Sequence, residues 1–546
     1  AIAWQRRRAL PLRIPDSDSA ALDASSMRTL FWFRKSLRLH DNPALIASLE
    51  DCTALYPVFC LDPWFVQSGK VGANRMQFLL ESLEDLDRSL RALNSRLIVL
   101  RGSPLEQLEL AFERWQINQI AYEIDTEPYA KERDAAVCKM AQKTKVKVLR
   151  RFGHTLCNVD ALLRRADGKP VTSYSAFLTN FNKEVNANPI VVLDPPAKLP
   201  PPKLEDAEDE HVVPSAKSLG LDLSDSLVVV KGGETHALKR MEEHIARASW
   251  IASFEKPKTS PTDHDPFGPS TRSTTLLSPY LKFGCLSPRL FYTRVADVYK
   301  THPKHSQPPT SLHGQLLWRE FYYACAHATP NYDKMAENPI CRQIDWDENE
   351  EFFEAWREGR TGYPWIDAAM TQLRREGWLH HLARHAVACF LTRGDLWISW
   401  EKGAAVFDEY LLDADWAINH GNWMWLSCSC FFYQYFRCYS PVAFPKKYDA
   451  NGDYVRKWLP QLAKYPAKYI YEPWKAPLSE QKRAGCVVGV DYPDRIVVHE
   501  TISKENMSRM AAAYAANKEG GADSGGSGAS GSRGSGGGGS GGGGGS

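Results

Sequence analysis

The sequence predicts an α/β N-terminal domain with a doubly wound parallel sheet and a larger all-α domain, joined by a long linker. Three observations lead to this fold class. Short β-rich runs alternate with helical patterns in the first 150 residues, a stretch rich in Pro, Lys and acidic residues follows, and the sequence is then helical and aromatic to about residue 500. The length of 546 residues also exceeds that of one ordinary domain.

Five apolar runs rich in β-forming residues are the predicted strands. They are Leu30–Phe33, Leu55–Leu61, Arg96–Leu100, Gln119–Ile124 and Val146–Leu149. The clearest intervening helix is Asn74–Leu93, where leucines recur at steps of three and four residues. Alternation of strands and helices implies a parallel sheet covered by helices on both faces, which we place at residues 27–160.

The linker is predicted at residues 161–231. Its core, Val191–Ser226, contains PPAKLPPPKLEDAEDEH, a composition that cannot bury enough apolar surface to form a core of its own. From Gly232 the pattern becomes helical and aromatic, and we assign residues 232–500 to the helical, ligand-binding domain.

Both ends of the chain differ from the rest. Residues 1–26 contain four arginines, show no fold pattern and do not begin with Met, so they are predicted to be a disordered extension, a targeting peptide or a non-native addition. Residues 501–546 are predicted to form a C-terminal helix followed by a disordered tail that is almost entirely Gly and Ser.

Composition excludes several classes of protein. No run of 18 uncharged apolar residues appears, so no membrane span is expected. The net charge of +2 argues against a uniformly basic surface, and a nucleic-acid partner would need a local basic face such as Arg374, Arg375, Lys446 and Lys447. The 12 cysteines form no CxxC pair, which disfavours an iron–sulfur or structural zinc site and favours reduced thiols.

The stretch Gly377–Trp400 is the most informative, because it places His381 and His385 at positions i and i+4. On a helix both imidazoles would cover one patch and could serve one substrate. Histidine can hold or give a proton near neutral pH, as a site that protonates a heteroatom requires. Zinc is disfavoured, because no Glu lies between the histidines and the adjacent Arg384 would repel a cation. Two ordinary helix histidines are the alternative.

A second stretch, Leu411–Pro441, interleaves tryptophans with Asp, Asn and His. Aromatic segments usually form core. However, buried polar groups need hydrogen-bonding partners, and a planar ligand with polar edges would supply them.

With these stretches, four further motifs resemble the photolyase/cryptochrome family, most closely the branch of (6-4) photolyases and animal-like cryptochromes. The motifs are LFWFRKSLRLHDNPAL from Leu30, TTLLSPYLKFGCLS from Thr274, LLWREFYY from Leu316 and TGYPWIDAAM from Thr361. The resemblance covers residues 28 to 500 and, because several motifs occur in order, is more specific than any one of them.

The resemblance implies FAD inside the helical domain, with a set of residues that would hold it. Thr274, Thr275 and Ser278 would supply donors to the pyrophosphate, although a helix N-cap is the alternative. Arg384 and Asp415 match the family's ion pair beside the isoalloxazine ring, and Asp413 matches the carboxylate near the ribityl group. Asn419 would face flavin N5, where an amide can accept a hydrogen bond without donating a proton.

The family also implies an electron path and a lesion pocket. Trp423, Trp400 and Trp346 match its tryptophan triad, and Trp397, predicted to share a helix face with Trp400, would be a fourth carrier. In the pocket Trp318 would stack on a flipped-out lesion, Gln315 would bind a base edge, and Tyr439 would close the wall. His381 and His385 would be catalytic, with one of them, His381 by preference, protonated.

These features predict an enzyme, a DNA photolyase that repairs (6-4) photoproducts in damaged DNA. One alternative is an animal-like cryptochrome that acts on clock or transcription partners in response to blue light, alone or together with repair. The other is a cyclobutane-dimer photolyase, which the histidine pair disfavours. An antenna pigment, deazaflavin or folate, is a further expected cofactor. We also predict a monomer in the nucleus, with chloroplast or mitochondrion as alternatives.

Overall fold

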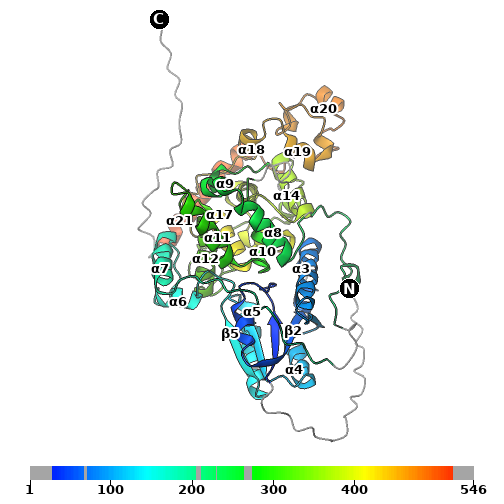
Figure 1. Cartoon of the computed structure of the whole chain (residues 1–546). Coiled ribbons are helices and arrows are strands. Elements are labelled where there is room, and N and C mark those ends of the chain that lie inside the picture. Colours follow the sequence, from blue (N-terminus) through cyan, green and yellow to red (C-terminus); the bar gives the residue numbers. More distant parts are fainter. Residues whose placement is uncertain (1–26, 67–69, 205–210, 229, 263–272, 520–546) are drawn as a thin grey trace.

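A five-stranded parallel sheet forms the N-terminal part of the molecule, and helices form the remainder, as Figure 1 shows. The structure, a computed structural model, describes residues 27–66, 70–204, 211–228, 230–262 and 273–519. The predicted fold class is confirmed. The predicted extension at 1–26 and the Gly/Ser tail from 520 lie outside the described residues.

The strands are ordered β3-β2-β1-β4-β5 across the sheet. All neighbours are parallel, which requires a crossover helix after each strand. The strands are β1 Met27–Phe33, β2 Cys52–Leu61, β3 Ile98–Arg101, β4 Gln119–Glu123 and β5 Lys147–Arg151. The accompanying helices are α1 Pro43–Ser48, α2 Pro63–Val66, α3 Ala73–Arg91, α4 Pro104–Arg114 and α5 Pro128–Lys143.

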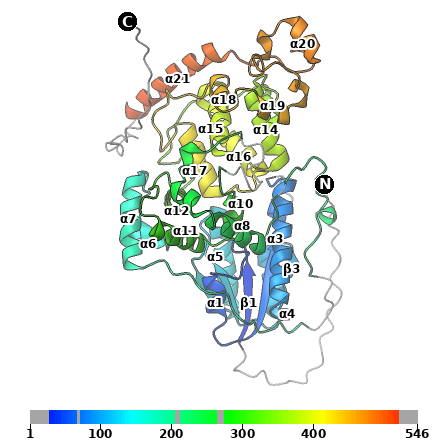
Figure 2. The ribbon, with the colours of Figure 1, turned by 45° about the horizontal axis from the view of Figure 1, so that its top comes forward.

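Alternate residues of β1 face opposite helix layers. Phe31 and Phe33 pack in the cluster that contains α1 and α3, whereas Leu30 and Trp32 pack in the cluster that contains α4 and α5. Both faces are therefore apolar, which explains the nearly continuous apolar strand sequences. Figure 2 shows the sheet with the helical part above it.

The segment predicted as linker contains two helices, α6 Val159–Arg164 and α7 Tyr174–Ala187. Both lie against α12 (Figure 2). Phe177 and Phe181, four residues apart on α7, are buried there. Residues 188–216, in contrast, form no helix or strand where they are described, and the chain makes the 3₁₀ turn Lys217–Leu219 before the helical part.

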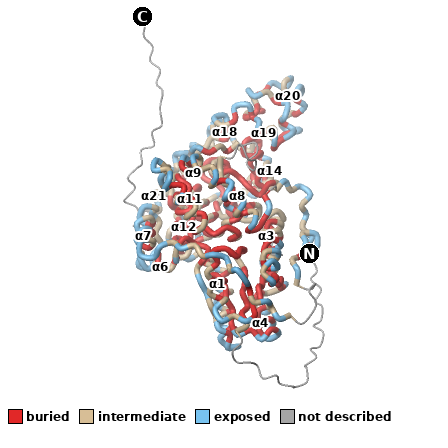
Figure 3. The backbone as a smooth tube through the Cα atoms, viewed as in Figure 1, coloured by how far each residue is buried: buried red, intermediate tan, exposed pale blue. Residues whose placement is uncertain are grey.

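Helices α8–α21 make up the helical part, and its interior forms one buried core together with a face of the sheet (Figure 3). The first seven are α8 Glu234–Ile245, α9 Ala248–Ser253, α10 Ser278–Lys282, α11 Pro288–Thr301, α12 Leu312–Ala328, α13 Glu350–Glu358 and α14 Pro364–Glu376. The others are α15 His381–Cys389, α16 Trp400–Tyr410, α17 Trp416–Leu426, α18 Ala443–Tyr448, α19 Asp453–Trp458, α20 Leu478–Ala484 and α21 His499–Glu519.

Buried ion pairs join the sheet to the helical part. The Arg289 guanidinium lies 2.9 Å from the Asp41 carboxylate, and Ser287 also donates to Asp41. His40 pairs with Glu234. Because breaking a buried pair leaves an uncompensated charge, these contacts hold the two parts in one relative orientation. In the described part of the chain, no helix is long and apolar enough to cross a bilayer.

Candidate flavin site and tryptophan chain

Three consecutive helices, α15, α16 and α17, carry six of the sixteen predicted site residues, namely His381, Arg384, His385, Trp400, Asn419 and Trp423. Each begins at a side-chain cap: His380 accepts from the Leu382 N–H, Ser399 from Glu401 and Asp415 from Ile418. Such caps satisfy backbone donors that a helix start leaves unpaired. Two predicted site residues are therefore the first residues of their helices: His381 begins α15 and Trp400 begins α16.

Arg384 forms its ion pair with Asp413, at 2.9 Å, and not with Asp415 as predicted. Ser278 donates to the same carboxylate at 2.6 Å. The prediction failed because Asp413 precedes α17 in the loop that faces α15, whereas Asp415 turns away as the cap of α17. Arg384, Asp413 and Ser278 are thus brought together as one polar chain.

Asp415 belongs to a different buried cluster. Its carboxylate accepts from the Tyr323 hydroxyl and lies 4.0 Å from His154. Burial alone would raise its pKa, but the contact with His154 and the charges of Lys35 and Lys282 hold the pKa of Asp415 well below its usual value. Asp415 therefore stays a carboxylate.

The Asn419 side chain has a fixed orientation. Its amide nitrogen donates to the Ala404 carbonyl and to Asp408 Oδ1, each at 2.9 Å. Both N–H groups are thereby used, and the carbonyl oxygen is left as an acceptor with no donor recorded in the described residues. This arrangement fits the predicted role of accepting a hydrogen bond from flavin N5.

These residues fit FAD. The site offers a guanidinium paired to a carboxylate, a serine hydroxyl and an amide oxygen that needs a donor. A flavin ring carries alternating hydrogen-bond donors and acceptors along its edge, and these groups can pair with both kinds. The Thr275 carbonyl accepts hydrogen bonds from Arg240 and His244, which fix the backbone three residues before Ser278. Thr274 is half-buried beside it. Residues 263–272, which lead into Thr274, lie outside the described residues.

The predicted electron carriers are arranged along α16. The Trp423 ring packs directly over Gly403, where an added Cβ would lie 2.2 Å from its Cη2 atom. Trp400, one turn before Gly403, is fully buried. Trp346 and Trp397, just outside the N-terminus of α16, contact each other with ring centroids 5.0 Å apart. The four indoles thus extend from the middle of α16 to beyond its start.

Trp397 does not share a helix face with Trp400, contrary to the prediction. The chain leaves α15 through a π turn at Phe390–Gly394 and reaches Trp397 with a left-handed φ of 54°. Its indole N–H donates to the Asp345 carbonyl at 2.7 Å. This irregular connection brings Trp397 into contact with Trp346. The Trp397 side chain is only 2% exposed.

The structure confirms that His381 and His385 lie on one helix, with ring centroids 5.8 Å apart. His385 Nδ1 lies 3.2 Å from the Tyr439 hydroxyl, as expected for one pocket. However, burial and then the charge of Lys256 lower the pKa of His385 to about 3 and hold that of His381 well below its usual value. Burial and the nearby cations thus favour the neutral form of both imidazoles, and the proton-donor role stays a prediction.

Gln315 and Trp318, the other two predicted pocket residues, lie three residues apart on α12. Trp318 stacks on Tyr174 of α7 at 4.1 Å and meets Trp425 edge-on, so its ring is already packed. Gln315 donates to the Pro309 carbonyl at 3.1 Å. The Trp318 indole would have to leave Tyr174 or offer its other face to stack on a ligand.

Two pocket residues were missed. Lys256 enters from the 3₁₀ turn Lys256–Lys258, and burial, then Arg384, lower its pKa to about 8. The ring centroids of His380 and His381 are 4.3 Å apart with the planes tilted by 42°, and His380 Nε2 lies 2.8 Å from the Thr259 hydroxyl. The His-His doublet was visible in the sequence, but Lys256 lies about 125 residues before the helix, and only the fold brings them together.

Replacing Lys256 with Met should raise the pKa of His385, because a nearby positive charge that opposes protonation is lost. NMR titration of the histidine ring protons measures this shift. Lys258→Met is the matched control, because Lys258 belongs to the same turn but its side chain is 72% exposed and pairs with Glu255. An unchanged His385 titration in Lys256→Met would contradict the assignment.

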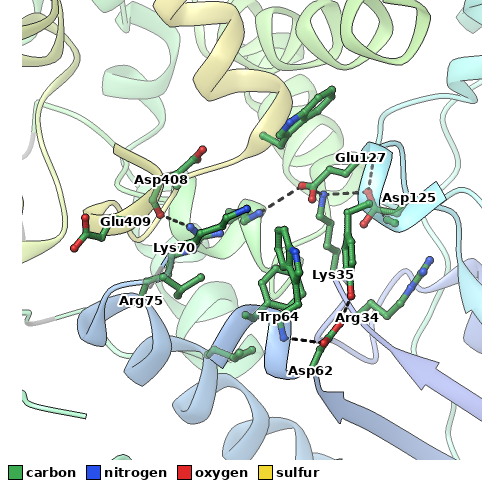
Figure 4. Close-up of a pocket in the computed structure, with 18 of the residues that line it drawn as sticks. Arg34, Lys35, Asp62, Trp64, Lys70, Arg75, Asp125, Glu127, Asp408 and Glu409 are labelled. Atoms are coloured by element: carbon green, nitrogen blue, oxygen red, sulfur yellow. Dashed lines mark hydrogen bonds and ion pairs between the residues drawn. The ribbon is translucent and has the colours of Figure 1, made fainter. Parts of the chain in front are cut away.

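A separate cavity of about 770 Å³ lies between the sheet and the helical part (Figure 4). It opens at the carboxyl ends of β1 and β2, where open α/β sheets commonly bind ligands. Its walls carry charges of both signs, among them Lys35, Glu127 and Asp408. None of the predicted FAD residues lines it. The predicted antenna pigment stays a prediction.

All twelve cysteines are free, and no group of three or more His, Cys, Asp or Glu in the described residues is arranged to hold a metal ion.

Two family models match the chain. The model described as DNA photolyase matches residues 29–202, and the one described as FAD binding domain of DNA photolyase matches residues 311–512. The second match supports the predicted cofactor, FAD.

The chain is similar to vertebrate cryptochromes. Cryptochrome-1 of Gallus gallus is 52% identical over 493 residues, which are 89% of this chain and 78% of that protein. Among solved structures, a Synechocystis cryptochrome has a TM-score of 0.76 at 28% identity, covering 88% of this chain and 99% of its own. A class III photolyase from Agrobacterium tumefaciens has a TM-score of 0.74 at 28% identity, covering 91% and 100%.

The prediction of a DNA-repair enzyme is therefore wrong. Similar solved structures include a cryptochrome and a photolyase, so the fold does not separate the two activities. The relatives at 50 to 52% identity, however, are Cryptochrome-1 and Cryptochrome-2 of birds and mammals. The prediction failed because it took the histidine pair His381 and His385 and the neighbouring aromatic residues as marks of repair.

Proposed function

Because the chain belongs to the photolyase/cryptochrome family and binds FAD, we propose that it is an animal-like cryptochrome that responds to blue light and acts through clock or transcription partners. The observation that carries this proposal is the row of indoles along α16, from Trp423 over Gly403 to the Trp346–Trp397 contact. Such a row connects a buried ring to a distant surface.

The protein residues have defined parts in this function. When bound, FAD supplies a photo-oxidant that can take one electron. Trp423 would lose that electron first, and Trp400 and then Trp346 would refill it in turn, with an external thiol reductant as the final donor. Asn419 would hold the ring edge through its carbonyl oxygen, and Arg384 with Asp413 would fix the ring's position.

The buried indole nitrogens are consistent with this use. Trp423 and Trp346 have buried N–H groups without a recorded acceptor, and Trp400 has only the Cys341 thiol nearby. A buried donor without a partner costs about 1–3 kcal/mol. Phenylalanine would avoid that cost, so packing alone does not favour tryptophan at these positions.

Binding to clock transcription proteins tests the proposal. A two-hybrid assay in darkness and under blue light should give different binding for the wild type, because the charge displaced along the chain changes the protein surface. Trp400→Phe should bind its partner equally in both conditions. Equal binding by the wild type in light and darkness would contradict the proposed function. Damaged DNA as a partner, the monomeric state and the nuclear location stay predictions.

A further inference from the structure

We propose that His420, together with Asp408, controls electron flow through the tryptophan chain, because a proton on the His420 imidazole makes the oxidation of Trp400 less favourable. This inference rests on the proposed light response. His420 follows Asn419 on α17 and is not one of the predicted site residues. Figure 4 shows Asp408, a residue of α16, on the wall of the cavity between the sheet and the helical part.

His420 lies beside the second indole of the chain. The ring centroids of His420 and Trp400 are 6.3 Å apart, and the ring planes make an angle of 77°. Trp400 is fully buried. A charge that appears on His420 therefore acts on Trp400 over a short distance inside the protein, where charges are screened less than in water.

The contacts of His420 identify the ring nitrogen that exchanges a proton. Nδ1 lies 2.7 Å from the Trp416 carbonyl oxygen, and because a carbonyl oxygen only accepts, Nδ1 carries a proton. Nε2 lies 3.7 Å from Asp408 Oδ2. Nε2 is therefore the atom that gains or loses a proton, and the positive charge that it gains faces the Asp408 carboxylate.

Asp408 connects His420 to the amide that is predicted to face the flavin. Its other oxygen, Oδ1, accepts from the Asn419 amide at 2.9 Å. While His420 is neutral, the pair carries the negative charge of Asp408, which favours a cation on the nearby Trp400. When His420 takes a proton from water, the two charges cancel and this support is lost. In both states Trp400 gives one electron to the vacancy on Trp423.

The cavity gives the proton access to the pair. His420 and Asp408 both line it. The side chain of His420 is 9% exposed and that of Asp408 is 30% exposed. Solvent in the cavity can therefore exchange protons with the pair while Trp400 stays buried. Histidine side chains commonly titrate between about pH 5 and pH 8, so the change falls in the physiological range.

The other charged groups near the pair have contacts of their own. On the cavity wall these contacts are Arg357 with Glu409, Lys402 with Glu350, Glu401 with the Ser399 hydroxyl, Lys35 with Asp125 and Glu127, and Arg75 of α3 with the Asp408 backbone carbonyl, and Asp333 lines the same cavity. On α12 and α15, which also pack on α17, they are Arg319 with Glu320, His327 with Asp160, Arg384 with Asp413 and His385 with Tyr439. Tyr332, beside Gly421, stays neutral because burial holds its pKa well above its usual value. Among the described residues, Asp408 is the one recorded ion-pair partner of His420.

The pH dependence of light-driven FAD reduction in the FAD-loaded protein tests the proposal, with ferrocyanide as an electron donor that takes up no proton in this range. The yield should be roughly tenfold lower at about pH 5.5 than at about pH 8.5. His420→Gln should keep the high yield at both pH values, because an amide gains no charge and Asp408 stays negative. His302→Gln, at the C-terminal end of α11, is the matched control and should follow the wild-type profile.

A second variant and a second measurement separate charge from packing. Asp408→Asn should give a low yield even at about pH 8.5, because the negative charge beside Trp400 is lost. In darkness, NMR of the His420 ring protons should show a titration between about pH 5 and pH 8. Asp408→Asn should move this titration to lower pH, because the carboxylate that favours the protonated imidazole is absent.

The two proposals fail in different ways. A His420→Gln profile equal to that of the wild type, or a His420 ring that does not titrate, would overturn the role of His420 and leave the light response standing. FAD that remains oxidised under light at every pH would overturn the proposed function, and the role of His420 with it.

Discussion

Replacing Trp423 with Phe should abolish light-driven reduction of bound FAD in the purified protein. Trp423 is the carrier nearest the predicted ring position, because it lies one turn after Asn419 on α17, and it packs over Gly403. Without this indole the first electron would have to cross the space that the ring now fills. Absorption spectroscopy during illumination, with an added thiol as the final donor, measures the loss.

Trp365→Phe is the matched control for this variant. Trp365 is also fully buried and has an indole N–H without a recorded acceptor, but it packs against Tyr454 and Phe444, away from the chain. Both replacements should cost on the order of 1–3 kcal/mol of unfolding free energy, because each removes buried ring atoms. Normal photoreduction in Trp423→Phe, or an equal loss in both variants, would contradict the assignment of Trp423.

Replacing Gly403 with Ala should destabilise the protein by about 1–3 kcal/mol, the usual cost of overpacking a core. The added Cβ would lie 2.2 Å from Trp423 Cη2 and 2.7 Å from a Leu391 methyl group. The sign of this effect is diagnostic, because Gly→Ala within an unhindered helix stabilises by about 0.5–1 kcal/mol. Urea unfolding of the two proteins measures the difference.

The double variant Gly403→Ala with Trp423→Phe separates the clash from other effects. Phenylalanine lacks the far atoms of the indole, so the alanine should cost less in this background than in the wild type. Equal costs in both backgrounds would mean that Trp423 does not pack on α16 as described.

The sheet was predictable because its side-chain pattern is local. Strands such as Leu55–Leu61 are nearly continuous apolar runs, and the α3 leucines repeat with helical spacing. The helix α7 was missed, although Phe177 and Phe181 have helical spacing, because the neighbouring Pro-rich sequence suggested a linker.

The site was predictable in its residue types and less so in their pairing. The order of the motifs indicated Arg384 and both aspartates, but which carboxylate faces Arg384 depends on where α17 begins. The position of Trp397 depends on a π turn and a left-handed residue, which side-chain periodicity does not indicate. Lys256 comes from a distant segment and changes the charge state expected of the histidines.

A protein that senses light through FAD and the indole row, and does not repair DNA, should reduce its flavin under light without changing damaged DNA. The most direct measurement is illumination of purified FAD-loaded protein with a thiol and an oligonucleotide that contains a (6-4) photoproduct, followed by analysis of both the flavin spectrum and the oligonucleotide. We expect that FAD becomes reduced and that the photoproduct remains intact. Restored thymines, or FAD that stays oxidised, would contradict it.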